Sequence, residues 1–246
     1  MTDTVAVIPT YNNAGTLADV IERTLAQGLP VVVVDDGCTD GTQDILRRFP
    51  VKPGMTGSDR QSLTVLKHTH NMGKGAALKT AFKWAREQGY SYAVTIDSDG
   101  QHYPEDIPLL MAAKGERTLV VGSRTMRGGN AGGSFANRFS NFWFTLYTGV
   151  HLVDTQTGFR LYPLNDLPSL KVVSSRYEAE LSLLVFSAWK GIRLVEVPVR
   201  VDYPENRVSH FRPFRDFMRI TVLNTLFLPI TLLYGYPRLL LNRLFV

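Results

Sequence analysis

The chain has 246 residues, of which 44% are hydrophobic and 20% are charged, as in an ordinary globular protein. This length suits one large domain, or a domain with an appendage, and the composition gives no sign of disorder. Cys38 is the only cysteine, which excludes an intrachain disulfide and favours a reducing compartment. The first ten residues lack a basic region and lead directly into a strand-like stretch, so we expect no secretory signal.

The formal net charge is +5, and arginines gather in the last fifty or so residues, beside apolar runs. Arginine in that setting suits phosphate groups or anionic lipid. Nucleic acid is the competing partner, but no nucleic-acid-binding motif is recognisable, so we expect none to bind.

Short β-branched runs alternate with helical stretches over the first half of the chain. The predicted strands are residues 4–8, 31–34, 63–66, 92–96 and 119–121, and the predicted helices are residues 15–27, 42–49, 75–88 and 104–113. This alternation predicts an α/β fold with a mostly parallel, Rossmann-like sheet flanked by helices. The chemically rich segments follow the strands, so they should meet at one edge of the sheet, where ligands bind in such folds.

The character of the sequence changes after about residue 128. Helical stretches at 135–147 and 177–190 are followed by a strand-like run at 193–201. Residues 220–236 carry no formal charge, yet they are too few and too polar to span a bilayer comfortably. We therefore divide the chain into a catalytic domain, residues 1–211, and a C-terminal membrane-interface helical segment, residues 212–246. The alternative is a core helix that packs on the sheet.

The sharpest motif is Asp97-Ser98-Asp99-Gly100-Gln101-His102, directly after a predicted strand. Alternate residues of an extended segment point the same way, so the two aspartates can converge. A divalent cation would relieve their repulsion, and Mg²⁺ takes one or two carboxylates together with water and substrate phosphate. We predict a Mg²⁺ or Mn²⁺ site made by Asp97, Asp99 and Gln101, with Asp99 in a catalytic role. The alternative is a polar loop that caps the following helix.

Two further motifs combine glycine turns with polar side chains. Asp35 and Asp36 end a buried strand and can accept hydrogen bonds from a nucleotide, while Asp40 or Thr39 can cap the next helix. Asn71-Met72-Gly73-Lys74-Gly75 opens a helix, where an anion is favoured, and this places Lys74 among the nucleotide contacts.

Arginine and acidic residues supply the remaining candidates. Arg124 follows a strand into the predicted cleft and can bind phosphate in a bidentate way. The segment 154–160, with sequence DTQTGFR, is either a plain turn leading to a strand or an acceptor pocket, and Asp154 is the candidate base if the acceptor is a hydroxyl.

Six segments carry a resemblance to a known family: residues 8–13 (IPTYNN), 31–42 (VVVVDDGCTDGT), 71–81 (NMGKGAALKTA), 97–102 (DSDGQH), 122–124 (GSR) and 154–160 (DTQTGFR). In these segments the chain resembles the family 2 glycosyltransferases of the GT-A fold, and most closely their dolichyl- or polyprenyl-phosphate mannosyltransferase-like branch.

The resemblance implies roles for individual positions. Pro9, Tyr11 and Asp35 or Asp36 match nucleotide contacts, and Asp97, Asp99 and Gln101 match the site for metal and diphosphate. Acceptor or phosphate contacts are expected at Arg124, Arg138, Arg160, Glu180, Arg207 and His210. Two positions depart from the family pattern: Asn13 replaces a frequent glutamate among the nucleotide contacts, and His210 replaces a frequent lysine.

These observations predict a metal-dependent, inverting transfer of a hexose from a GDP-mannose or UDP-glucose type donor to a membrane-associated acceptor, such as polyprenyl phosphate or another lipid. The enzyme would lie on the cytoplasmic face of a membrane as a peripheral or monotopic protein. The alternatives are a nucleotide-binding scaffold or regulatory protein with a degenerate transferase site, and a nucleotidyltransferase built on the same type of sheet.

Overall fold

The computed structural model describes residues 2–49, 62–124, 135–169, 178–202, 225 and 227–244. Its centre is a seven-stranded sheet in the order β3-β2-β1-β4-β6-β5-β7. The strands are β1 (Thr4–Thr10), β2 (Val31–Asp35), β3 (Leu63–Lys67), β4 (Tyr92–Thr95), β5 (Thr118–Arg124), β6 (Arg160–Pro163) and β7 (Arg193–Val199). The α/β class and the mostly parallel sheet predicted from the sequence are confirmed, with each predicted strand close to its expected position.

The short strand β6 is the one that runs against the others. It pairs antiparallel with β4 on one side and with β5 on the other, and Arg160 lies opposite both Thr95 and Val121. Because of this direction, β6 begins at the edge where β4 and β5 end. The preceding segment, residues 154–159, is thereby delivered to the carboxyl edge of the parallel strands.

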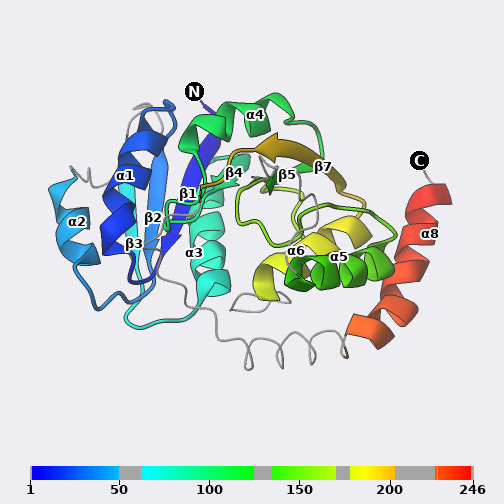
Figure 1. Ribbon diagram of the computed structural model, residues 1–246. Coiled ribbons are helices and arrows are strands. Elements are labelled where there is room, and N and C mark those ends of the chain that lie inside the picture. Colours follow the sequence, from blue (N-terminus) through cyan, green and yellow to red (C-terminus); the bar gives the residue numbers. More distant parts are fainter. Residues whose placement is uncertain are drawn as a thin grey trace.

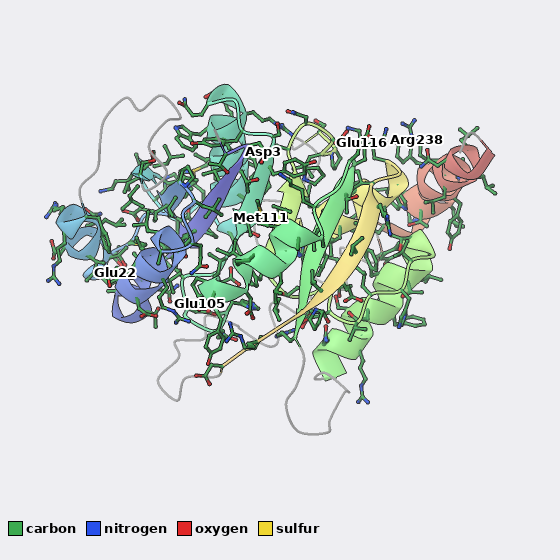
Figure 2. All side chains as sticks on the ribbon, turned by 90° about the horizontal axis from the view of Figure 1, so that it is seen from above. Asp3, Glu22, Glu105, Met111, Glu116 and Arg238 are labelled. Carbon is green, nitrogen blue, oxygen red and sulfur yellow. The ribbon has the colours of Figure 1, made fainter. Side chains whose placement is uncertain are left out.

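Helices cover both faces of the sheet because alternate strand residues point to opposite sides. Val5 and Val7 of β1 belong to the core on the face with α3 (Lys74–Glu87), α5 (Phe135–Thr148) and α6 (Glu178–Trp189). Ala6 and Ile8 belong to the core on the other face, with α1 (Ala14–Leu25), α2 (Thr42–Arg48) and α4 (Ile107–Ala112). Figure 1 shows the sheet between these two helical layers, and Figure 2 views the second face, with Met111 on α4 near its centre.

The described part of the C-terminal segment packs against helices rather than on the sheet. A π-helical turn (Thr231–Gly235) leads into α8 (Tyr236–Leu244), which lies at the edge of the molecule beside α5 and α6 (Figure 1). Phe227 is only 3% exposed, and its ring contacts those of Tyr147 and Trp189. The Tyr236 hydroxyl donates to the carbonyl oxygen of Leu146 at 2.7 Å.

The opposite side of this segment exposes large apolar side chains. Those more than a third exposed are Leu228, Ile230, Leu232, Leu233, Tyr234, Tyr236, Leu240 and Leu241. In the ranges that the structure describes, no helix has both the length and the apolar character needed to cross a membrane. The predicted boundary between residues 211 and 212 lies outside the described residues.

The packing of Phe227 can be tested by truncation. We expect Phe227→Ala to lower the free energy of unfolding by about 3–5 kcal/mol, because it removes a buried aromatic ring. Leu233→Ala is the control in the same segment: its side chain is 82% exposed, so the change should stay within about 0.5 kcal/mol. Urea denaturation followed by tryptophan fluorescence measures both. Equal, small changes would show that the segment does not pack on α5 and α6.

Candidate active site at the carboxyl edge of the sheet

A partly buried ion pair joins two of the predicted motifs. Asp97 follows β4, and its Oδ1 lies 2.6 Å from Nζ of Lys74, the first residue of α3. Lys74 Nζ also lies 2.9 Å from Oε2 of Glu180 on α6. Burial by itself would lower the pKa of Lys74, but the two carboxylates outweigh it and raise that pKa above its ordinary value. The lysine therefore stays charged and connects β4, α3 and α6.

Gly158 makes room for this ion pair. A Cβ placed there would lie 2.5 Å from Asp97 Oδ2 and 2.6 Å from Lys74 Nζ, so any side chain at this position would require the ion pair to shift. The glycine of the DTQTGFR segment thus lets the backbone before β6 pass directly over the Asp97–Lys74 pair.

Asp99 stands in a different electrostatic environment from Asp97. Burial and the neighbouring Asp97 carboxylate raise the pKa of Asp99, whereas for Asp97 the Lys74 ammonium overcomes the effect of burial and lowers the pKa. Gln101 donates to Asp99 from its backbone N–H at 3.1 Å and from its side-chain amide at 2.5 Å. The three predicted metal ligands therefore lie in one short loop at the carboxyl edge.

This donor set fits Mg²⁺ or Mn²⁺. Among the described residues, no group of three or more His, Cys, Asp or Glu side chains is arranged to hold a metal ion. Mg²⁺, however, usually takes one or two carboxylates and completes its shell with water and substrate phosphate. The Lys74 ammonium against Asp97 shows that this pocket of oxygen atoms accommodates positive charge.

Arg124 and Asp154 form a second ion pair, at the end of β5. Nε and Nη2 of Arg124 donate to the two carboxylate oxygens at 2.5 and 2.8 Å. The backbone N–H groups of Arg124 and Gln156 donate to the same carboxylate, and Asp154 is only 2% exposed. Because its oxygen atoms are all engaged, Asp154 is poorly placed to act as the predicted general base.

Two residues that sequence reasoning missed hold the backbone around Asp154. The Glu196 carboxylate on β7 accepts from the N–H groups of Val153 and Asp154. Asn141 on α5 accepts from Thr155 and donates to the carbonyl oxygen of Val153. The signal for Glu196 is a lone acid in β7, where the residues after Arg193 are otherwise apolar.

Asp36 differs from its prediction as a nucleotide contact. It is buried, and its carboxylate accepts from the N–H groups of Met72 and Gly73 at 2.9 and 2.8 Å and lies 2.6 Å from His68 Nδ1. The sequence predicted an anion at the glycine-containing start of α3 (residues 71–75). In the structure the Asp36 carboxylate occupies this place and fixes the start of the helix. Asp35 is also buried, and its Oδ1 accepts from the backbone N–H of Cys38.

The first motif is tied to its neighbours by side chains. Asn13 Nδ2 donates to Ser98 Oγ at 2.9 Å, between the two metal-site aspartates. Asp40 accepts from the N–H groups of Ala14 and Thr42, the first residues of α1 and α2, although the N-cap residue of α2 is Gly41 and not Asp40. Pro9 is buried in β1 and Tyr11 is half-buried just beyond it. Contact of Pro9, Tyr11 and Asn13 with a nucleotide stays a prediction.

The remaining predicted phosphate contacts are dispersed. Arg160 is 0% exposed, and its guanidinium donates to the carbonyl oxygens of Glu180 and Thr155, which is a structural role rather than the predicted acceptor contact. Arg138 is exposed on α5. Arg207 and His210 lie outside the described residues.

His102 is buried near Asp97, and burial lowers its pKa to about 4, so its imidazole is neutral.

Named relatives are similar to this chain over most of its length. The chain is 33% identical over 204 residues to undecaprenyl-phosphate mannosyltransferase of Micrococcus luteus, covering 78% of this chain and 81% of that relative. It is 28% identical over 243 residues to the UDP-N-acetylglucosamine–dolichyl-phosphate N-acetylglucosaminyltransferase of Methanococcus voltae, covering 88% and 94%.

A solved structure shares the fold. Glucosyl-3-phosphoglycerate synthase from Mycobacterium tuberculosis, crystallised with Mn²⁺, UDP and glucosyl-3-phosphoglycerate, superposes with a TM-score of 0.62 at 19% identity, covering 93% of this chain and 79% of that chain. The family model described as glycosyl transferase family 2 matches residues 5–162, which include the metal-site loop and Asp154. The chain belongs to glycosyl transferase family 2.

Proposed function

We propose that the protein transfers a hexose from a nucleoside-diphosphate sugar to the phosphate of a polyprenyl lipid. The named relatives support the class of acceptor, since one acts on undecaprenyl phosphate and the other on dolichyl phosphate. The same names include two different sugars, mannose and N-acetylglucosamine, and only the second is named with its UDP-linked donor, so they do not select the sugar.

The observation that carries this proposal is the pairing of Asp154 with Arg124. A hydroxyl acceptor needs a base to take its proton, but the Asp154 oxygens already accept from the guanidinium and from two backbone N–H groups. A phosphate monoester is already ionised at neutral pH and needs no base. The geometry therefore favours a phosphate acceptor, with Asp154 acting to position the Arg124 guanidinium beside the anion.

The residues of the metal-site loop define the donor side of the reaction. Asp97, Asp99 and Gln101 would hold a divalent cation, which neutralises the charge that develops on the leaving diphosphate. An acceptor phosphate oxygen forms the new bond to the anomeric carbon while the bond from that carbon to the diphosphate breaks. Attack from the side opposite the leaving group inverts the configuration at that carbon.

Asp99→Asn tests the donor side. We expect transfer to fall about 100-fold or more, because the carboxylate acts where diphosphate charge develops, with the melting temperature nearly unchanged. Asp19→Asn, an exposed aspartate on α1, is the control and should keep full activity. Transfer of labelled sugar to polyprenyl phosphate and to unphosphorylated polyprenol measures both the variants and the acceptor class.

Three outcomes would count against this proposal. Wild-type turnover by Asp99→Asn would remove that residue from the mechanism. Transfer to the unphosphorylated polyprenol would remove the argument from Asp154. An absence of transfer with any nucleotide sugar, even with Mn²⁺ added, would favour the alternative of a nucleotide-binding scaffold.

We also propose that the enzyme meets its acceptor by lying on the cytoplasmic surface of a membrane. An apolar C-terminal surface, consisting of Phe142, Leu146, Leu232, Leu233, Leu240 and Leu241, is exposed on α5, the π-helical turn and α8. Neither α5 nor residues 227–244 contain an acidic residue, whereas Arg138, Arg238 and Arg243 lie in these segments. Figure 2 shows Arg238 at the end of the molecule farthest from Glu22 on α1.

Liposome flotation tests the membrane contact. Protein should float with vesicles that contain anionic lipid, and salt should weaken binding because each basic residue near the surface contributes about 1 kcal/mol of screened attraction. Leu233→Glu together with Leu240→Glu should abolish flotation. Leu109→Glu, which places the same charge on an exposed leucine of α4, should leave it intact. The assignment of this surface would be refuted if the double variant and Leu109→Glu both lost flotation to the same extent, or if neither of them lost it.

A further inference from the structure

The side chain of Lys74 lies against the carboxylates that are proposed to bind the divalent cation. Its ammonium is 2.6 Å from Asp97 and 2.9 Å from Glu180, and the side chain is only 16% exposed. The protein thus supplies one positive charge of its own at the place where a second cation has to bind. We propose that Lys74 is a built-in counter-ion that makes this site bind a metal–diphosphate complex in preference to the bare metal ion. This inference rests on the proposed metal-dependent function.

Lys74 is held in this position from several sides. Asp36 accepts from the N–H groups of Met72 and Gly73 and so fixes the backbone just before the lysine. Gly158 lies against the ammonium from a third direction, so close that a side chain there would displace Lys74 or Asp97. Retraction of the lysine would leave the carboxylate of Glu180 buried without its cation, since Glu180 Oε1 already has no hydrogen-bond partner among the residues that the structure describes. An incoming metal ion therefore has to share Asp97 with Lys74.

The net charge of the site indicates which ligand it prefers when a metal ion shares Asp97 with Lys74. The site contains four carboxylates (Asp97, Asp99, Asp154 and Glu180) and three cationic side chains (Lys74, Arg124 and Arg160), so with every carboxylate ionised the net charge is −1. A bare divalent cation would change this net charge to +1, and a bare sugar diphosphate would change it to −3. A divalent cation with a sugar diphosphate is neutral and leaves the net charge at −1. Each partner alone is therefore disfavoured relative to the two together.

Removal of the lysine charge reverses this preference. In Lys74→Met the same groups carry −2, which a bare divalent cation neutralises. We expect this variant to bind Mn²⁺ alone about tenfold or more tightly than the wild type, because a buried like charge near the metal has been removed. Addition of UDP-glucose or GDP-mannose should strengthen Mn²⁺ binding strongly in the wild type and less in the variant.

Electron paramagnetic resonance of Mn²⁺ measures this without any turnover, because the signal of the free ion falls as the ion binds. Lys83→Met is the matched control: it removes the same charge from an exposed position on α3, and its Mn²⁺ affinity should equal that of the wild type. If Lys74→Met does not fold, the same comparison is made in the Glu180→Gln background, where no buried acid is left without its lysine. The double variant should again bind bare Mn²⁺ more tightly than Glu180→Gln alone.

The results separate the inference from the function on which it rests. Unchanged or weaker binding of bare Mn²⁺ after loss of Lys74, with normal Mn²⁺–nucleotide binding by the wild type, would overturn the inference and show that the lysine orients Asp97 for the metal. Failure of the wild type to bind Mn²⁺ even with nucleotide sugars would overturn the metal assignment and the inference together.

Discussion

The candidate site depends on one electrostatic constraint: the partly buried Asp97 and the buried Glu180 lie close together, and the ammonium of Lys74 lies between them. Without that cation, two carboxylates would be removed from water beside each other, which is unfavourable. The triad fixes three elements that are distant in sequence, since its members come from the end of β4, the start of α3 and the first turns of α6. This triad therefore determines where the proposed metal-site loop (Asp97, Asp99 and Gln101) lies relative to α6.

Other contacts surround this triad and make it rigid. Asp36 ties the end of β2 to the loop before α3, and Asn13 ties the end of β1 to Ser98 in the metal-site loop. On the far side, the antiparallel strand β6 brings Gly158 against Asp97 and places Asp154 beside Arg124 at the end of β5. The residues proposed to bind the donor and those proposed to bind the acceptor thereby lie at one edge of the sheet, which supports the proposed transfer between a diphosphate and a phosphate.

The sequence predicted the sheet and its helices because the strands are buried on both faces and read as continuous apolar runs. It offered a strand at the end of residues 154–160 only as one of two alternatives, since four residues are too few to show a period. It did not predict the direction of β6, which depends on pairing with β4 and β5. The metal-site residues were predicted from local spacing. The roles of Asp36, Asp154 and Arg160 were not, because each is decided by partners distant in sequence that only the fold brings together. The same holds for Lys74, which a glycine-rich helix start suggested as a ligand contact.

The central claim is that the loop of Asp97, Asp99 and Gln101, with Lys74 behind it, receives the donor diphosphate through a divalent cation. A crystal structure of the protein with Mn²⁺ and UDP or GDP tests this most directly, because the anomalous signal of manganese locates the ion. The account predicts a manganese ion about 2.0–2.3 Å from the side-chain oxygens of this loop, shared with the diphosphate, while Lys74 remains in contact with Glu180. A diphosphate bound away from the carboxyl edge, or a manganese ion held without any contact to Asp97 or Asp99, would contradict it.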